Sequence, residues 1–273
     1  MRPVGETSEI ALILPDIFSI VNKIVARFYG PRLRRLILKL TTVRILIKEC
    51  KESWPRGPGC QVQNKRVSNS LEFMNSLCTG IILAGGQNTR FSGTNKALVS
   101  VGGKRIFDRI YDVFSNLFQD IILVTNDPAP YLEWDLTIVT DLFPLRSSLT
   151  GVHAGLFNMT TPYAFFAACD TPFIKQNLIE IILAGIAPHI DIVVPETSQG
   201  FQPLCAVYSR RCLEHATRQL EKQELKIDRI FKKLRVKKIP EKILKKQDPD
   251  LISFFNINTP EDLAQAEDML AKL

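Results

Sequence analysis

The chain has 273 residues, of which 45% are hydrophobic and 23% charged, which indicates a globular protein with a sizeable core and excludes a disordered or fibrous chain. A formal charge of +7 suggests a nucleic-acid partner, but its distribution removes most of that suggestion. Residues 1–73 hold 13 of the 35 basic and 6 of the 28 acidic residues, which leaves 22 of each sign downstream. We therefore expect no nucleic-acid partner.

The cysteines and histidines show no metal-binding or disulfide pattern. The six cysteines include no C-x-x-C pair, and the chain has only three histidines. Buried, reduced thiols in a reducing compartment are the expected state. A run of roughly 18 uncharged apolar residues, which a spanning helix needs, does not occur, and a secretory signal is not recognisable. We expect a cytoplasmic protein without a transmembrane segment.

The first quarter of the chain is predicted to be a basic N-terminal extension of uncertain order. Between residues 17 and 40, apolar residues alternate with arginines at loosely helical spacing, interrupted by Gly30-Pro31. Residues 53–70 are rich in Gly, Pro, Ser and Asn and are typical of a linker. Three interpretations remain open: helices lying on a membrane or partner surface, a poorly ordered extension, or upstream sequence before a start at Met74. The predicted domains are 1–73 and 74–273.

From Cys78 onward, short apolar runs alternate with helical stretches. The runs typical of strands are Thr79–Leu83, Ile121–Thr125, Thr137–Thr140, Tyr163–Ala168 and Ile190–Pro195. The helical stretches are Arg105–Leu117, Thr150–Met159, Gln176–Ile186 and Arg211–Glu221. This alternation predicts a doubly wound α/β fold with a mostly parallel sheet and Rossmann-like topology. Such sheets bind ligands at the carboxyl ends of their strands.

The loop after the first strand is the strongest indication of a ligand site. Gly85 and Gly86 allow the backbone to approach an anion and to direct consecutive N–H groups toward it. Arg90 and Lys96 add positive charge within reach of the same place. This combination suits a nucleoside triphosphate, whose β- and γ-phosphates leave as pyrophosphate. The spacing matches neither the phosphate loop of ATPases nor the dinucleotide-binding fingerprint, so both of those functions are disfavoured.

The same loop resembles the signature of the molybdenum cofactor guanylyltransferases, a family of the nucleotidyltransferase superfamily. The matching segments are L-A-G-G, T-R-F and N-K-A-L, at residues 83–86, 89–91 and 95–98. The family's usual loop is L-A-G-G-x-S-x-R-M-G-G-x-D-K, so this chain departs from it at Phe91, Ser92 and Asn95 and retains the lysine as Lys96.

Further segments resemble the family in the same order along the chain. They are an aspartate after a strand at Asp141, a counterpart of G-P-L-x-G with serines at 147 and 148, and C-D-T-P-F at residues 169–173. Nearer the C-terminus they are P-L-C-A-V at 203–207, which resembles a strand of the family, and N-I-N-T-P-E-D-L at 256–263. The family has an asparagine at a strand end where this chain has Val124, and Asn126 is a candidate replacement. The likeness covers residues 79 to the C-terminus and leaves 1–73 uncovered.

The resemblance implies a set of site residues. Those expected to bind GTP are Leu83, Ala84, Gly85, Gly86, Lys96, Asp141 and Asp170, with Asp170 also holding Mg²⁺. The expected catalytic residues are Lys96, Arg90 and Asp170, which neutralise charge rather than act as a general base.

Simpler structural roles compete at several of these positions. Asp170 could cap the next helix, and Asp141 could be an ordinary solvated aspartate. His153 is expected to pack locally or to position a ligand rather than to catalyse. Asn256, Asn258 and Thr259 are expected to cap the last helix, with Pro260 in its first turn, although the resemblance also places this segment near the acceptor pocket.

The implied reaction is transfer of GMP from GTP to molybdopterin, the molybdenum cofactor, with release of pyrophosphate. Proteins that mature molybdoenzymes are possible further partners. Two alternatives remain open: transfer of another nucleotide, such as CMP, to molybdopterin or a sugar phosphate, and a carrier that binds cofactor or nucleotide without turnover.

Overall fold

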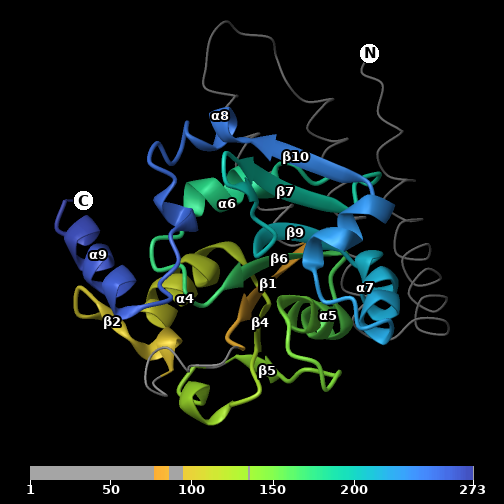
Figure 1. The fold of residues 1–273 in the computed structure, drawn as a ribbon, viewed down its shortest axis with the longest axis horizontal. Coiled ribbons are helices and arrows are strands. Elements are labelled where there is room, and N and C mark those ends of the chain that lie inside the picture. Colours follow the sequence, from red (N-terminus) through yellow and green to blue (C-terminus); the bar gives the residue numbers. More distant parts are fainter. Residues whose placement is uncertain (1–76, 86–94, 135, 273) are drawn as a thin grey trace, which may run out of the picture. The chain divides into compact units, whose positions relative to one another are not determined.

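The fold is built on one eight-stranded sheet, seen in the computed structural model of the chain (Figure 1). The structure describes residues 77–85, 95–134 and 136–272, so the predicted extension 1–73 lies outside the described residues. The strands follow the order β10-β7-β9-β6-β1-β4-β5, and the short β8 pairs with β7. Their bounds are Cys78–Leu83 (β1), Ile121–Val124 (β4), Thr137–Val139 (β5), Tyr163–Ala168 (β6), Ile192–Thr197 (β7), Gly200–Phe201 (β8), Cys205–Ser209 (β9) and Val236–Pro240 (β10).

The sheet is mostly parallel, which confirms the predicted fold class. β1 lies between β4 and β6 and runs parallel to both, with Leu83 opposite Val124 on one side and Ala168 on the other. β5 continues the parallel arrangement beyond β4, and β10 runs parallel to β7. Only β8 and β9 run against their neighbours in the described sheet. The apolar runs before residue 200 predicted five strands correctly to within two residues at each end, but β8 and β10 were not predicted.

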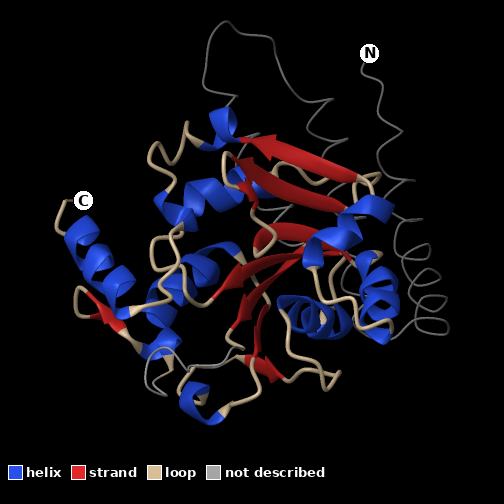
Figure 2. Cartoon of the chain, in the orientation of Figure 1, coloured by secondary structure: helices blue, strands red, loops and turns tan. Residues whose placement is uncertain are grey.

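Helices cover both faces of the sheet (Figure 2). The longer helices are α4 (Ile106–Leu117), α5 (Ser148–Asn158), α6 (Gln176–Leu183), α7 (Cys212–Glu221) and α9 (Pro260–Leu270). The shorter ones are α8 (Glu241–Leu244) and the 3₁₀ turns η2 (Lys96–Leu98), η3 (Ala129–Tyr131), η4 (Ile227–Lys233) and η5 (Ile252–Phe254). A small hairpin of β2 (Ser100–Val101) and β3 (Lys104–Arg105) turns through Gly102 and Gly103, which have φ of 57° and 75°.

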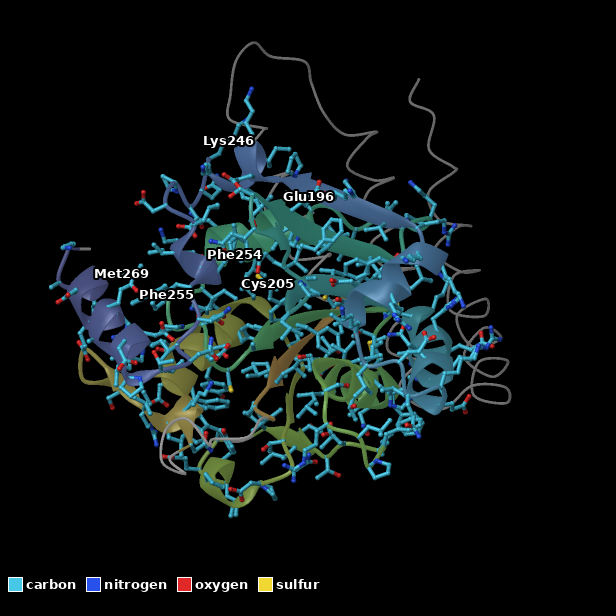
Figure 3. The ribbon with its side chains drawn as sticks, in the orientation of Figure 1. Glu196, Cys205, Lys246, Phe254, Phe255 and Met269 are labelled. Atoms are coloured by element: carbon cyan, nitrogen blue, oxygen red, sulfur yellow. The ribbon has the colours of Figure 1, made fainter. Side chains whose placement is uncertain are left out.

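Successive strand residues divide between two cores because their side chains alternate across the sheet. Ile82 and Leu123 pack with α4 and α6 on one face, and Phe254 and Phe255 cover the edge of that core (Figure 3). Ile81 and Val124 pack with α5 and α7 on the other face. The near-continuous apolar strands are therefore explained by burial on both sides.

One glycine sets how closely α5 approaches the sheet. A Cβ atom at Gly155 would lie 2.8 Å from side-chain atoms of Ile81 and Phe166, closer than real Cβ contacts allow. A larger residue there would push α5 away from β1 and β6. Near the start of this helix, a Cβ atom at Gly151 would lie 3.3 Å from the side chain of Leu83, the last residue of β1, so the position of α5 also shapes the edge where ligands are expected.

Candidate active site

The site edge is formed by the carboxyl ends of β1, β4, β5 and β6. Main-chain pairing continues past the strand ends: Ala84 N–H donates to Val124 O at 2.9 Å, and Cys169 N–H donates to Leu83 O at 3.0 Å. Ala84 is half-buried and Gly85 exposed. No described atom, the neighbouring residues apart, lies within 4 Å of a Cβ built on Gly85, so no described side chain crowds the backbone there. This is where the sequence placed the phosphate-binding loop. Gly86 and Arg90 lie outside the described residues.

Lys96 is held through the turn that carries its backbone and through the end of its side chain. It is the first residue of η2, whose cap Asn95 accepts a hydrogen bond from Ala97 N–H at 3.1 Å. The Asn95 amide also donates to the hydroxyl of buried Tyr131 at 3.0 Å, which ties the turn to the segment after β4. At the end of the side chain, Lys96 Nζ donates to Asn258 Oδ1 at 2.9 Å.

Asp170 follows β6, and one of its carboxylate oxygens has no partner in the part of the chain that the structure describes. This oxygen, Oδ1, is buried. Burial raises the pKa of this carboxyl group, and the nearby Lys96 charge acts in the opposite direction. Its main-chain oxygen accepts from Ile257 N–H at 2.9 Å. Asp170 does not cap the next helix, because α6 begins at Gln176 with Lys175 as its cap residue.

The geometry around Asp170 suits a hard divalent cation. A buried carboxylate oxygen without a protein donor is the type of group that such a cation binds. The described residues contain no group of three or more His, Cys, Asp and Glu side chains that could hold a metal by themselves. The remaining ligands would have to be phosphate oxygens and water, as is usual for Mg²⁺ at nucleotide sites.

Asp141 and Asn126 form a second polar pair along the same edge. Asn126 Nδ2 donates to Asp141 Oδ2 at 2.8 Å, and Asn126 Oδ1 accepts from Asp141 N–H at 3.0 Å. Val124 points into the core beside α5 and is 2% exposed, so its side chain is not available to a ligand. Asn126 is exposed at the strand end and contacts the aspartate expected to bind nucleotide.

Ser147 and His153, at the start and in the middle of α5, take local structural roles. Ser147 caps α5 by accepting from Thr150 N–H at 3.2 Å, which explains how this chain starts the helix with serines. His153, 4% exposed, meets Thr217 Oγ1 at 3.0 Å between α5 and α7 and packs edge-on against Phe143. Burial lowers its pKa, so the ring is neutral at pH 7 and packs locally.

The predicted cap of the last helix is correct for Thr259 but wrong for Asn258. Thr259 and Asp262 form a capping box at the start of α9, with Pro260 in the first turn. The side chain of Asn258 instead reaches Lys96, a contact that spans 162 residues of sequence. No local pattern predicts such a contact, although the N-x-N-T-P segment marked the region as more than a cap.

Comparison with known proteins places this edge in a functional context. The family model of the MobA-like NTP transferase domain matches residues 80–238. The molybdenum cofactor guanylyltransferase of Desulfosudis oleivorans is 51% identical over 189 residues, covering 69% of this chain and 94% of that protein. A probable molybdenum cofactor guanylyltransferase of Natranaerobius thermophilus is 35% identical over 199 residues, covering 71% of this chain and 97% of that protein.

A solved structure shows the same fold. The molybdopterin-guanine dinucleotide biosynthesis protein A of Archaeoglobus fulgidus superimposes with a TM-score of 0.62 at 29% identity, covering 71% of this chain and all of that one. The sheet, the site edge and these matches define an enzyme of the nucleotidyltransferase class. The chain belongs to the MobA-like NTP transferase family and, within it, to the molybdenum cofactor guanylyltransferases. Enzymes of this family use a divalent metal.

Proposed function

We propose that this protein transfers GMP from GTP to a terminal phosphate of molybdopterin and releases pyrophosphate. The observation that carries the proposal is a buried oxygen of Asp170 that has no donor among the described residues, at the carboxyl ends of the strands and close enough to Lys96 to feel its charge. Membership of the guanylyltransferase family gives the nucleotide and the acceptor. A carrier without turnover would not need a cation and a buried, unsatisfied carboxylate at this position.

The nucleotide would lie across the end of β1. Leu83, Ala84 and Gly85 close the strand, and no described side chain crowds Gly85, so phosphate oxygens can reach the backbone there. Gly86 and Arg90 follow in the same loop and are assigned to the phosphates from sequence. Asp141, oriented by Asn126, is assigned to the nucleotide farther along the edge.

Asp170 would hold Mg²⁺ together with phosphate oxygens and water. When bound, the ion neutralises negative charge on the α- and β-phosphates of GTP. Among the described residues, Asp170 is the strand-end carboxylate of this edge whose buried oxygen is left without a donor. The preference for Mg²⁺ over other hard cations is part of the proposal.

The chemistry requires positioning and charge neutralisation more than proton transfer. An oxygen of the molybdopterin phosphate forms a bond to the α-phosphorus of GTP. The bond between that phosphorus and the oxygen bridging the α- and β-phosphates breaks, and this oxygen leaves with pyrophosphate. Nucleophile and leaving group are both already anionic, so no general base is needed. Lys96 and Arg90 stabilise the negative charge that develops on the departing pyrophosphate. Lys96 is preorganised for this role by Asn95 and Asn258.

Location and domain limits are part of the same proposal. None of the described helices is long and apolar enough to cross a membrane. The described cysteines are all free, and Cys78, Cys205 and Cys212 are buried, which supports a reducing compartment. We assign the protein to the cytoplasm, the transferase domain to residues 74–273, and proteins that mature molybdoenzymes as recipients of the product.

The test is pyrophosphate release by the full chain with molybdopterin, Mg²⁺ and each of the four nucleoside triphosphates in turn. Release with GTP alone is expected, together with a product that contains guanine. Release with CTP would keep the mechanism but replace the nucleotide, and silence with all four would overturn the proposed enzyme in favour of a carrier.

A further inference from the structure

Lys96 and Asp170 carry opposite charges at the same edge of the sheet but do not pair with each other in the described structure. The ammonium of Lys96 donates to the neutral amide oxygen of Asn258 at 2.9 Å. Asp170 Oδ1, although buried, is left without a donor. In a partly desolvated site an ammonium and a carboxylate attract each other strongly, so their separation requires a structural cause.

Asn258 supplies that cause because its backbone is fixed on both sides. Its own N–H donates to Asp262 Oδ2 at 2.8 Å, within the capping box of α9. The preceding residue, Ile257, donates its N–H to the main-chain oxygen of Asp170 at 2.9 Å. The backbone that carries the Asn258 amide is therefore hydrogen-bonded to Asp170, and the same amide holds Lys96 away from Asp170.

A second described carboxylate near Lys96, that of Asp262, is already engaged. Asp262 Oδ2 accepts from the N–H groups of Asn258 and Thr259, both at 2.8 Å. A lysine released from Asn258 would thus find the unsatisfied oxygen of Asp170 as its strongest acceptor. An ammonium bound there would neutralise the carboxylate and compete with any cation for the same oxygen.

We propose that Asn258 is a positioning residue that holds Lys96 away from Asp170 and so keeps the Asp170 carboxylate open to the divalent cation. This inference rests on the proposed function, since it assumes that Asp170 binds the cation. With the two charges held apart, Lys96 is free to bind the phosphates and Asp170 is free to bind the metal.

The test measures metal binding without turnover. The full chain is titrated with GTP by calorimetry, in the absence of acceptor, at a series of buffered free Mn²⁺ concentrations. The readout is the Mn²⁺ concentration that gives half of the metal-dependent gain in GTP affinity. Asn258→Ala is expected to raise this concentration roughly five- to tenfold, because a partly exposed ion pair then competes for the carboxylate. Asn258→Ser, with a shorter side chain, is the second variant and should give the same shift.

Two matched variants make the readout specific. Asn258→Asp keeps an acceptor for Lys96 and should leave the half-saturating Mn²⁺ at or below the wild-type value. Asn256→Ala changes an exposed asparagine two residues away and should leave the value unchanged. In a Lys96→Met background no ammonium can move, so adding Asn258→Ala should then have no effect on Mn²⁺.

The outcomes separate this inference from the function on which it rests. If Asp170→Asn removes the Mn²⁺ dependence while Asn258→Ala and Asn258→Ser leave it unchanged, the inference is wrong and the metal assignment stands. If Asp170→Asn retains the wild-type Mn²⁺ dependence, the inference and the metal assignment are both wrong.

Discussion

Two aspartates, at opposite ends of the strands, differ in how far hydrogen bonds satisfy their carboxylates. Asp191 precedes β7 at its amino end and is 5% exposed, yet both of its oxygens are satisfied by Arg211 and by the side chain and N–H of Arg235. Asp170 follows the parallel strand β6 at its carboxyl end and has a buried oxygen without a donor among the described residues. At the amino ends of the strands the paired carboxylate stabilises the fold, whereas at the carboxyl ends a carboxylate oxygen is left without a described donor where a ligand is expected.

The pKa values of the two groups move in opposite directions. Hydrogen bonds from Arg235 and Arg211 hold the pKa of Asp191 well below its usual range, although burial acts against them. Burial raises the pKa of Asp170. The native state therefore favours the ionised form of Asp191, which stabilises the fold, and disfavours the ionised form of Asp170, the residue proposed to hold the cation.

The largest effect is expected from removing the unsatisfied charge. Asp170→Asn should lower the rate of GMP transfer by a hundredfold or more, equivalent to about 3 kcal/mol. The free energy of unfolding at pH 7 should stay equal or rise, because the native state no longer holds a buried unpaired carboxylate. Pyrophosphate release and urea denaturation measure the two quantities. Near-wild-type turnover, or a less stable protein, would contradict the comparison.

A second buried aspartate offers an intermediate case. Asp248 is fully buried and accepts from Lys175 Nζ at 2.8 Å and from Ser253 N–H at 2.8 Å, which fixes the segment leading to Asn258. Lys175→Met should destabilise the protein by about 2–3 kcal/mol, because it leaves a charge that water cannot reach. Asp248→Asn should have a smaller effect, because the side chain of Lys175 is 36% exposed and can be hydrated. Urea denaturation of both variants tests this order, and the reverse order would refute it.

Asp191→Asn should reduce the free energy of unfolding by about 1–2 kcal/mol at pH 7 and leave transfer unchanged. The partner arginines are 49% and 57% exposed, so water replaces part of the lost interaction. Since the folded-state pKa lies below the unfolded value of about 4, the stabilisation is complete above pH 4 and is lost as pH falls through the folded pKa. The difference between wild type and variant should therefore shrink on acidification, as measured by urea denaturation at pH 7 and below pH 4.

The smallest effect is expected from removing residues 1–73. The described residues complete the sheet and both covering layers, and the family match begins at residue 80. A 74–273 fragment should keep the transfer rate within about twofold, an effect comparable to neutral surface changes. Parallel rate measurements on the fragment and the full chain test the predicted boundary. A folded but inactive fragment would show that the extension contributes to the site.

The local sequence predicted most of the elements that position the site. The apolar runs before residue 200 were correct because strands buried on both faces must be almost continuously apolar. β9 was expected only from the family-like P-L-C-A-V segment, and β10 was missed because lysines alternate with apolar residues along it. The Lys96 and Asp170 positions followed from motifs, because strand ends bring such residues to one edge whatever lies between them.

By itself the sequence determined the fold class, the family, the edge where a ligand is expected, and which residues are proposed to bind phosphate and metal. Only the tertiary structure decided which partners these groups have: Asn126 contacts Asp141, and Asn258 accepts a hydrogen bond from Lys96. Among the described residues, one oxygen of Asp170 has no donor, whereas both oxygens of Asp191 have donors. The physical reason is distance along the chain. Periodicity and caps depend on neighbouring residues, whereas the partners of a buried charge are brought together only when the whole sheet has formed.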